Sequence, residues 1–233
     1  MTMKRAVLWD MDGTLVDSAD FHWLAWRETM SREGCPITYE QFLATFGQRN
    51  DSILRQWLGE NTTHEVMQRI GNAKESLYRQ HVRQQGISAL PGALEWLHLL
   101  HRKGWGQAIA SAAPCANIET ILDVLQARHL FQAIVSAEDV RRGKPDPEVF
   151  LTAAIKLSVA AKDCIVVEDA KHGIEAALAA GMKTIGVSQN GNHLPADIVV
   201  RSLSLLDENA FEHLLGNGSM PRRFDNSLDP AKA

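Results

Sequence analysis

The apolar and polar positions at the start of the chain predict a buried strand that ends in two acids. Residues 5–9 are mostly apolar and too few for a helix, which favours a strand. Asp10 and Asp12 follow at its end and, two positions apart in an extended backbone, point to the same side. Gly13 then allows the chain to turn, because glycine adopts backbone angles that other residues avoid. The pattern therefore predicts two carboxylates that face one pocket.

From residue 18 to about residue 86 the apolar positions recur at helical spacing. The expected helices cover residues 18–33, 39–45, 51–58 and 63–84. Ser18 is expected to cap the first of them. The apolar stripe of the longest helix would consist of Val66, Ile70, Ala73 and Leu77. We therefore expect a small all-helical domain at residues 17–88, inserted directly after the first strand.

From Leu90 onward, strands alternate with helices. The expected strands cover residues 106–111, 133–136, 163–168, 183–187 and 198–200. The expected helices cover residues 91–102, 114–127, 147–157, 173–180 and 206–215. Such alternation favours an α/β fold, in which a doubly wound, Rossmann-like parallel sheet is covered by helices on both faces. Residues 1–16 and 89–216 would form this core, and the tail at 217–233, rich in Gly, Asn and Ser, would be loosely ordered.

Composition and charge narrow the class of protein. An apolar content of 45% and a charged content of 22% are ordinary for a soluble globular chain. A net charge of −4 gives no electrostatic case for a nucleic-acid or membrane partner. No apolar run approaches the roughly 20 residues of a transmembrane helix, and the first residues do not resemble a signal peptide. The cysteines, Cys35, Cys115 and Cys164, are widely spaced, which fits a reducing compartment. We expect a cytoplasmic protein, monomeric or weakly oligomeric, that acts on a small molecule.

Polar residues at the strand ends could form one site, because the carboxyl ends of parallel strands meet at one edge of a sheet. Asp10 and Asp12 would repel each other unless a cation or a shared proton intervenes, and a hard cation such as Mg²⁺ suits two such carboxylates. Ser111 ends the next expected strand just before Pro114, where a hydroxyl and free backbone N–H groups can bind phosphate oxygens. An ordinary Asp/Gly turn and a helix-capping serine are the alternatives.

Two further charged segments follow in the second half of the chain. Lys144 lies between Gly143 and Pro145, which stiffen the backbone around it, and its ammonium could neutralise a phosphate or the paired aspartates. Glu168 and Asp169 stand at the end of a later strand, where they are well placed to bind a metal. Taken alone, each segment could equally be a solvent-exposed turn.

Together these segments resemble the haloacid dehalogenase-like superfamily of phosphotransferases. The matching motifs are Asp10-Met11-Asp12-Gly13-Thr14, Ser111, Lys144-Pro145-Asp146-Pro147, Glu168-Asp169, Gly173-Ile174-Glu175-Ala176-Ala177 and Gly181-Met182. The match covers nearly the whole chain. The insertion after Asp17 resembles the subgroup with a helical cap, which includes β-phosphoglucomutase and many small sugar-phosphate phosphatases. The dehalogenases of the superfamily lack the second aspartate, so Asp12 favours phosphoryl chemistry.

The resemblance implies a role for each strand-end residue. Asp10 would attack phosphorus and form an aspartyl-phosphate, and Asp12 would protonate the leaving oxygen and later deprotonate water. Ser111 and Lys144 would hold the phosphoryl oxygens and stabilise the charge that develops on them. The implied Mg²⁺ ligands are Asp10, the backbone carbonyl of Asp12, Asp169, and Glu168 directly or through water.

The resemblance also suggests which residues contact the rest of the substrate. The implied substrate-binding residues are His22, Trp26, Arg49, Lys74 and Ala112. His22 and Trp26 are four residues apart and share a helix face, although core packing explains Trp26 as well. Arg49 resembles a cap arginine whose planar guanidinium grips substrate oxygens. Lys74 either snorkels from the edge of the apolar stripe or points into the cleft.

The function that the resemblance implies is a Mg²⁺-dependent phosphatase of small phosphorylated metabolites, with sugar phosphates foremost. The alternative is a phosphomutase of the β-phosphoglucomutase type. In those enzymes the segment after the motif serine resembles Ser-Ala-Ser-Lys, whose second serine and lysine help to grip the non-reacting phosphate. This chain has Ala113 and Pro114 at those two positions, which favours release of the phosphoryl group to water. A binding protein on an inactive phosphatase scaffold is a third possibility.

Overall fold

A parallel β-sheet forms the centre of the molecule. The computed structural model describes residues 5–216, and the predicted loose tail at 217–233 lies outside them. The sheet has six strands in the order β3-β2-β1-β4-β5-β6, all parallel. The strands are β1 (Ala6–Trp9), β2 (Gly106–Ala110), β3 (Ala133–Val135), β4 (Cys164–Glu168), β5 (Lys183–Val187) and β6 (Ile198–Val200). The strand β1 lies between β2 and β4, with Leu8 opposite both Ala108 and Val166.

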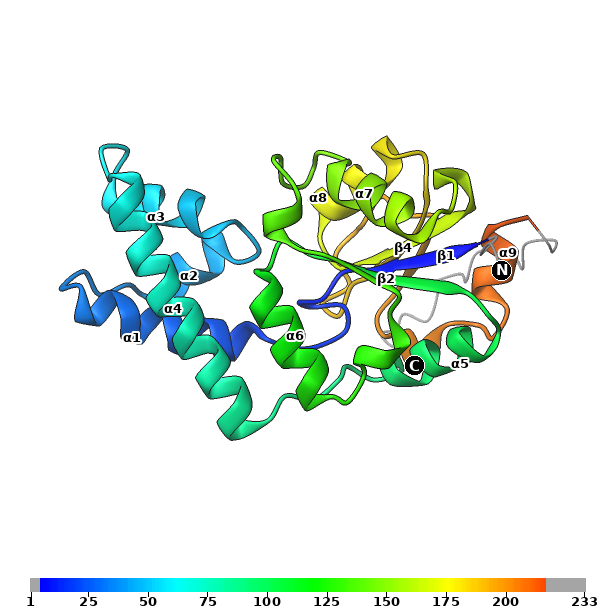
Figure 1. Cartoon of the computed structure of the whole chain (residues 1–233), viewed down its shortest axis with the longest axis horizontal. Helices are drawn as coiled ribbons and strands as arrows, with labels where there is room; N and C mark the ends of the chain where they lie inside the picture. Colours follow the sequence, from blue (N-terminus) through cyan, green and yellow to red (C-terminus); the bar gives the residue numbers. More distant parts are fainter. Residues whose placement is uncertain (1–4, 217–233) are drawn as a thin grey trace, which may run out of the picture.

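Helices cover both faces of the sheet, as Figure 1 shows. On one face lie α5 (Ala93–Arg102), α6 (Cys115–Val124) and α9 (Ala210–Leu214), and on the other lie α7 (Glu148–Leu157) and α8 (Lys171–Ala179). Because successive strand residues point to opposite faces, Val7 and Trp9 pack in the first layer and Leu8 packs in the second. Strands buried on both sides read as continuous apolar runs, which is the pattern in this sequence. The predicted α/β fold class is therefore confirmed.

Four helices form a separate bundle beside the sheet (Figure 1). These are α1 (Ala19–Arg32), α2 (Tyr39–Thr45), α3 (Asn50–Leu58) and α4 (His64–Gln85), which we call the cap. Their buried apolar side chains are Trp26, Met30, Phe42, Ile53, Leu54, Met67 and Ile70. Val16 and Ala89, which flank these helices in the sequence, form an antiparallel bridge. Among residues 5–216, no helix combines the length and the apolar character needed to cross a bilayer.

Short 3₁₀ turns, which the sequence patterns do not reveal, complete the connections. They cover Arg128–Leu130, Ala137–Asp139, Ala161–Asp163 and Leu203–Leu205. The predicted helix at 206–215 is shorter in the structure, because α9 begins only at Ala210 and residues 206–209 form a bend and a turn. Asp207 Oδ1 accepts a hydrogen bond from the backbone N–H of Asn209 at 2.9 Å, a local side-chain contact that favours a turn over the start of a helix.

Two predictions about the cap helices are wrong. Ser18 precedes α1, but its side chain makes no capping hydrogen bond; the hydroxyl contacts Asp12 instead. The predicted apolar stripe of α4 is wrong at Ala73, which is exposed, whereas Ile70 is buried and Val66 and Leu77 are half-buried. The buried face of α4 consists of Met67, Ile70, Gly71, Lys74, Glu75, Tyr78 and Val82. A lysine and a glutamate therefore lie in the middle of this buried face, where apolar periodicity cannot reveal them.

Candidate active site

Three carboxylates meet at the carboxyl end of β1 and β4. Asp10, Glu168 and Asp169 each offer a carboxylate oxygen, and these oxygens lie within 4.8 Å of one another. They come together because β1 and β4 are neighbouring parallel strands that end at the same edge of the sheet. Lys144 approaches from the loop before α7, and its Nζ donates to Asp10 Oδ1 at 2.6 Å and to Glu168 Oε1 at 2.5 Å.

This cluster carries more negative charge than one ammonium can neutralise. Burial, only partly offset by Lys144 and reinforced by Glu168, raises the pKa of Asp10 to about 7. Burial and the neighbouring charges of Glu168 and Asp10 raise the pKa of Asp169 to about 9. Burial opposes the charge on Lys144, yet the two carboxylates beside it raise its pKa above the ordinary value. Asp10 and Asp169 thus lose their protons less readily than isolated carboxyl groups do, because burial and the neighbouring negative charges oppose their ionisation. A bound cation would relieve the repulsion among these charges.

Two glycines leave room for these carboxylates. Gly13 has a φ of 82°, and a Cβ built on it would collide with the carboxylate of Asp169. A Cβ on Gly173, in α8, would collide with the carboxylate of Glu168. The oxygen-rich donor set and the space kept for it fit a hard divalent cation held by Asp10, Glu168 and Asp169.

Asp12 lies beside this cluster, but its carboxylate is engaged elsewhere. Its Oδ1 accepts a short hydrogen bond from the Ser18 hydroxyl and lies 3.6 Å from Nε2 of His22. Burial alone would favour the protonated acid, but His22, Ser18 and the charge of Lys74 hold the pKa of Asp12 below its ordinary value. The side chain of Asp12 is not among the grouped ligands, so its predicted part in metal binding rests on its backbone carbonyl.

The contacts of His22 define its tautomer. Lys74 Nζ lies 2.8 Å from His22 Nδ1, and since an ammonium can only donate, Nδ1 is the acceptor. The ring proton of a neutral His22 therefore sits on Nε2, the nitrogen that faces Asp12. Burial, together with the charge of Lys74, lowers the pKa of His22, which favours this neutral form. Tyr78 stacks on the ring with centroids 4.2 Å apart and fixes its plane.

The structure brings the predicted phosphate-binding residues together with one cap arginine. Ser111, at the end of β2, is buried, and its Oγ accepts from the backbone N–H of Ala113 at 3.1 Å. A hollow in the surface is lined by Ser111, Ala112 and Lys144 from the sheet unit and by Arg49 from the cap. Arg49 is the residue before α3; its side chain is 38% exposed, and its Nε lies 3.5 Å from Asp51 Oδ1.

Trp26 and Lys74 lie deeper than the sequence suggests. Trp26 is 1% exposed and packs edge-on against Trp57 within the cap, so the structure favours core packing for this residue. Lys74 is 2% exposed; its ammonium lies 5.2 Å from the centre of the Trp26 ring and contacts His22 and Glu75. Lys74 is thus connected to the site through His22. Its side chain is buried and does not snorkel to the surface or extend into an open cleft.

Sequence reasoning missed three polar residues near the site. Ser18 was assigned to a helix cap, and its hydroxyl instead contacts Asp12. Glu75, on α4, and Asn117, on α6, are both buried and hydrogen-bonded to each other. The turn at Gly13, which returns the chain toward Asp12, is the sequence signal for the contact of Ser18, but nothing in the sequence pairs Glu75 with Asn117.

Known proteins resemble this chain in sequence and in fold. The sequence profile of the haloacid dehalogenase-like hydrolases matches residues 7–187. The chain is 34% identical over 206 residues to β-phosphoglucomutase of Bacillus subtilis, a match that covers 86% of this chain and 90% of that one. It is also 34% identical over 190 residues to hexitol phosphatase A of Escherichia coli, covering 79% and 83% of the two chains. The crystal structure of β-phosphoglucomutase from Clostridium difficile superposes with a TM-score of 0.81 at 27% identity, covering 91% and 97%. The chain belongs to the haloacid dehalogenase-like hydrolase family, in its β-phosphoglucomutase-like group.

Proposed function

We propose that this protein is a Mg²⁺-dependent phosphatase of small phosphorylated metabolites, with sugar phosphates as the main class. The observation that carries the proposal is the position of Asp10. Its carboxylate lies within the acidic cluster and accepts a hydrogen bond from Lys144 at 2.6 Å. Asp12 lies beside the cluster but is hydrogen-bonded to a different residue, Ser18. This arrangement supports attack by Asp10 and proton transfer by Asp12.

The chemistry divides between the two aspartates. A carboxylate oxygen of Asp10 attacks phosphorus, the bond from phosphorus to the leaving oxygen breaks, and Asp12 gives that oxygen a proton. Water then attacks phosphorus, Asp12 takes the proton of that water, and the bond from phosphorus to the Asp10 oxygen breaks, which releases inorganic phosphate and restores the carboxylate. Asp12 serves as base in its ionised form, which its lowered pKa favours. Ser111 and Lys144 lie where they can hold phosphoryl oxygens during both steps.

The fit of the acidic cluster supports the choice of cofactor. Asp10, Glu168 and Asp169 would hold Mg²⁺, together with the backbone carbonyl of Asp12. The bound ion would neutralise charge on the transferring phosphoryl group and relieve the repulsion among the carboxylates. Lys144 supplies a second positive charge that does not depend on the ion.

The cap supports a small substrate. We propose that residues 17–88 form a domain of their own that covers the site, with residues 1–16 and 89–216 as the catalytic domain. Arg49 reaches from the cap to the loop that carries Lys144, since its Cδ would lie 3.5 Å from a Cβ on Gly143. The relative named hexitol phosphatase A and a second, a fructose-1-phosphate phosphatase from Escherichia coli, act by name on phosphorylated sugars or sugar alcohols.

A phosphomutase is the second candidate, favoured by the likeness to two β-phosphoglucomutases. Such an enzyme returns the phosphoryl group to the sugar and must hold a bisphosphate by both ends. In this chain Ala113 and Pro114 offer neither a hydroxyl nor a cation to a second phosphate. Arg49 would have to bind the second phosphate without these groups. Weaker binding of a bisphosphate favours transfer of the phosphoryl group to water.

The test is a panel of phosphate monoesters with and without Mg²⁺. For β-glucose 1-phosphate with a trace of glucose 1,6-bisphosphate, both glucose 6-phosphate and free phosphate are measured. We expect Mg²⁺-dependent release of phosphate from sugar phosphates. Rapid formation of glucose 6-phosphate with little free phosphate would make the protein a mutase. No turnover of any ester would favour a binding protein on this scaffold.

A further inference from the structure

A buried carboxylate joins the cap to the sheet unit. Glu75, on α4, is 6% exposed, and both of its oxygens are hydrogen-bonded. Oε1 accepts from Lys74 at 2.8 Å and from Asn50, at the start of α3, at 2.7 Å. Oε2 accepts a short hydrogen bond from the amide of Asn117, on α6. Of these partners, Asn117 is the one that belongs to the sheet unit.

Asn117 is itself held in one orientation. It is 1% exposed, and its carbonyl oxygen accepts from Arg79 Nη1 at 2.9 Å. Because its amide group donates to Glu75 and its carbonyl accepts from Arg79, Asn117 bridges two charged residues one turn apart on α4. A separate contact lies one turn further along, where Arg83 Nη2 donates to Thr120 Oγ1 at 3.0 Å. Helices α4 and α6 lie side by side in Figure 1, and these contacts join them.

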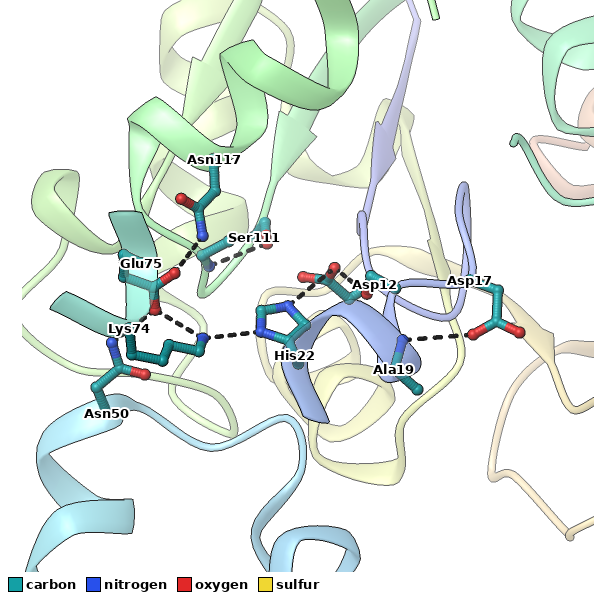
Figure 2. Close-up of polar contacts among 11 residues, drawn as sticks. Asp12, Asp17, Ala19, His22, Asn50, Lys74, Glu75, Ser111 and Asn117 are labelled. Carbon is teal, nitrogen blue, oxygen red and sulfur yellow. Dashed lines mark hydrogen bonds and ion pairs between the residues drawn. The ribbon is translucent and has the colours of Figure 1, made fainter. Parts of the chain in front are cut away.

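From Glu75 a continuous chain of contacts reaches the acid/base. Figure 2 shows Asn117, Glu75, Lys74, His22 and Asp12 in succession. The ammonium of Lys74 lies between Glu75 and His22, at 2.8 Å from each. Burial disfavours the charge on Lys74, and the negative charge of Glu75 opposes that effect. Glu75 therefore decides where the Lys74 ammonium sits, and Lys74 in turn orients the His22 ring that faces Asp12.

We propose that Glu75 and Asn117 are positioning residues that connect the placement of the cap to the geometry of the acid/base. Neither residue touches the reacting atoms. Asn117 holds Glu75 only while α4 lies against α6, and Glu75 holds Lys74 and, through it, His22. Moving α4 away from α6 breaks the bond to Asn117 and loosens the whole chain of contacts up to Asp12. This proposal rests on the proposed function of Asp12.

Substitutions at this contact can be compared with a matched control. Asn117→Ala removes the donor to Glu75, and Glu75→Gln removes the charge that faces Lys74. Thr120→Val serves as the control, because it deletes the neighbouring contact to Arg83 at the same helix interface. Thr120 and Asn117 are buried to a similar extent. Asn117→Ser, which keeps a donor, is measured beside Asn117→Ala in case the latter fails to fold. Thermal unfolding of each variant checks that the fold is retained.

The first readout does not depend on activity. Nitrogen-15 spectra of the histidine side chains report the tautomer of His22, which is assigned with a His22→Gln variant. We expect the wild type to carry the proton on Nε2 with Nδ1 as an acceptor. Asn117→Ala and Glu75→Gln should change the signals of His22, and Thr120→Val should not. Unchanged His22 signals in both variants would overturn the proposal, even if the protein turned over no phosphate ester.

The second readout is kinetic and separates positioning from structural damage. With a sugar phosphate, Asn117→Ala should lower kcat/KM on the order of tenfold, the value of one well-made hydrogen bond. In a Lys74→Met background the same substitution should cost little more, because the group through which it acts is gone. An equal loss in both backgrounds, or an equal loss from Thr120→Val, would contradict the proposal. A changed His22 spectrum without any kinetic loss would contradict it as well.

Discussion

Lys144 Nζ lies 2.6 Å from Asp10 Oδ1, although 134 positions separate the two residues in the chain. The contact exists because β1 ends beside β4, and the loop before α7 reaches over that edge of the sheet. A buried aspartate that is expected to attack phosphorus is thereby paired with a cation. The same ammonium also contacts Glu168, which ties the predicted nucleophile to the predicted metal ligands.

Asp12→Asn should separate proton transfer from attack. The amide cannot protonate a leaving oxygen, so turnover of sugar phosphates should fall on the order of 10²–10⁴-fold. An aryl phosphate with an acidic leaving group needs no such proton in the first step, so its first half-reaction should be much less affected. Rapid-mixing measurements of the released phenol test this. If the rate of this first half-reaction fell equally with the sugar phosphate and with the aryl phosphate, the acid role of Asp12 would be contradicted.

Gly173→Ala should impair metal binding without weakening the helix. Alanine is a better helix former than glycine, but its Cβ would collide with the carboxylate of Glu168. We expect the concentration of Mg²⁺ needed for half-maximal activity to rise at least several-fold. Gly71→Ala, in α4, is the control, since the atoms nearest to its new Cβ lie 3.6 Å away. A normal Mg²⁺ requirement in Gly173→Ala would argue against Glu168 as a ligand.

The stabilisation by Mg²⁺ should depend on pH with a defined sign. The pKa values of Asp10 and Asp169 are raised from 3.8 to about 7 and about 9, so without metal the folded state binds more protons than the unfolded state between these values. The stability that these two groups contribute is therefore present at low pH and lost as the pH rises from about 4 to about 9. A bound cation should replace those protons.

Thermal unfolding with EDTA or with Mg²⁺ measures this effect. We expect Mg²⁺ to raise Tm more at about pH 8.5 than at about pH 6, because more protons must be displaced at the lower pH. The double variant Asp10→Asn, Asp169→Asn should lose both the pH dependence and most of the Mg²⁺ effect. A Mg²⁺ shift that is larger at the lower pH would mean that these carboxylates do not hold the ion.

Arg49→Ala should affect the choice of substrate more than the chemistry. Arg49, from the cap, lines the hollow beside Ser111 and Lys144. The variant should therefore lower kcat/KM for a sugar phosphate, while an aryl phosphate, which makes few cap contacts, should lose much less. Arg55→Ala, at an exposed position of α3, the helix that follows Arg49, is the control. Equal losses on both substrates would point to structural damage instead of recognition.

The strand ends were predictable from the sequence, whereas the contacts between distant polar residues were not. Short apolar runs followed by acids indicate where parallel strands end, which is why Asp10 and Glu168 could be assigned to one edge. Ser18 resembles a cap because it precedes a helix; its actual partner depends on the turn at Gly13, which returns the chain toward Asp12. Glu75 resembles a solvated helix residue, since only the packing of α4 against α6 buries it.

The most direct test of the central claim is Mg²⁺-dependent phosphate release by the wild type and by Asp10→Asn. With a sugar phosphate as substrate, the wild type should release phosphate in Mg²⁺, stop in EDTA and recover when Mg²⁺ is added back. Asp10→Asn should be inactive in all three conditions, because an amide neither attacks phosphorus nor binds the ion well. Near-normal Mg²⁺-dependent release by Asp10→Asn would contradict the account.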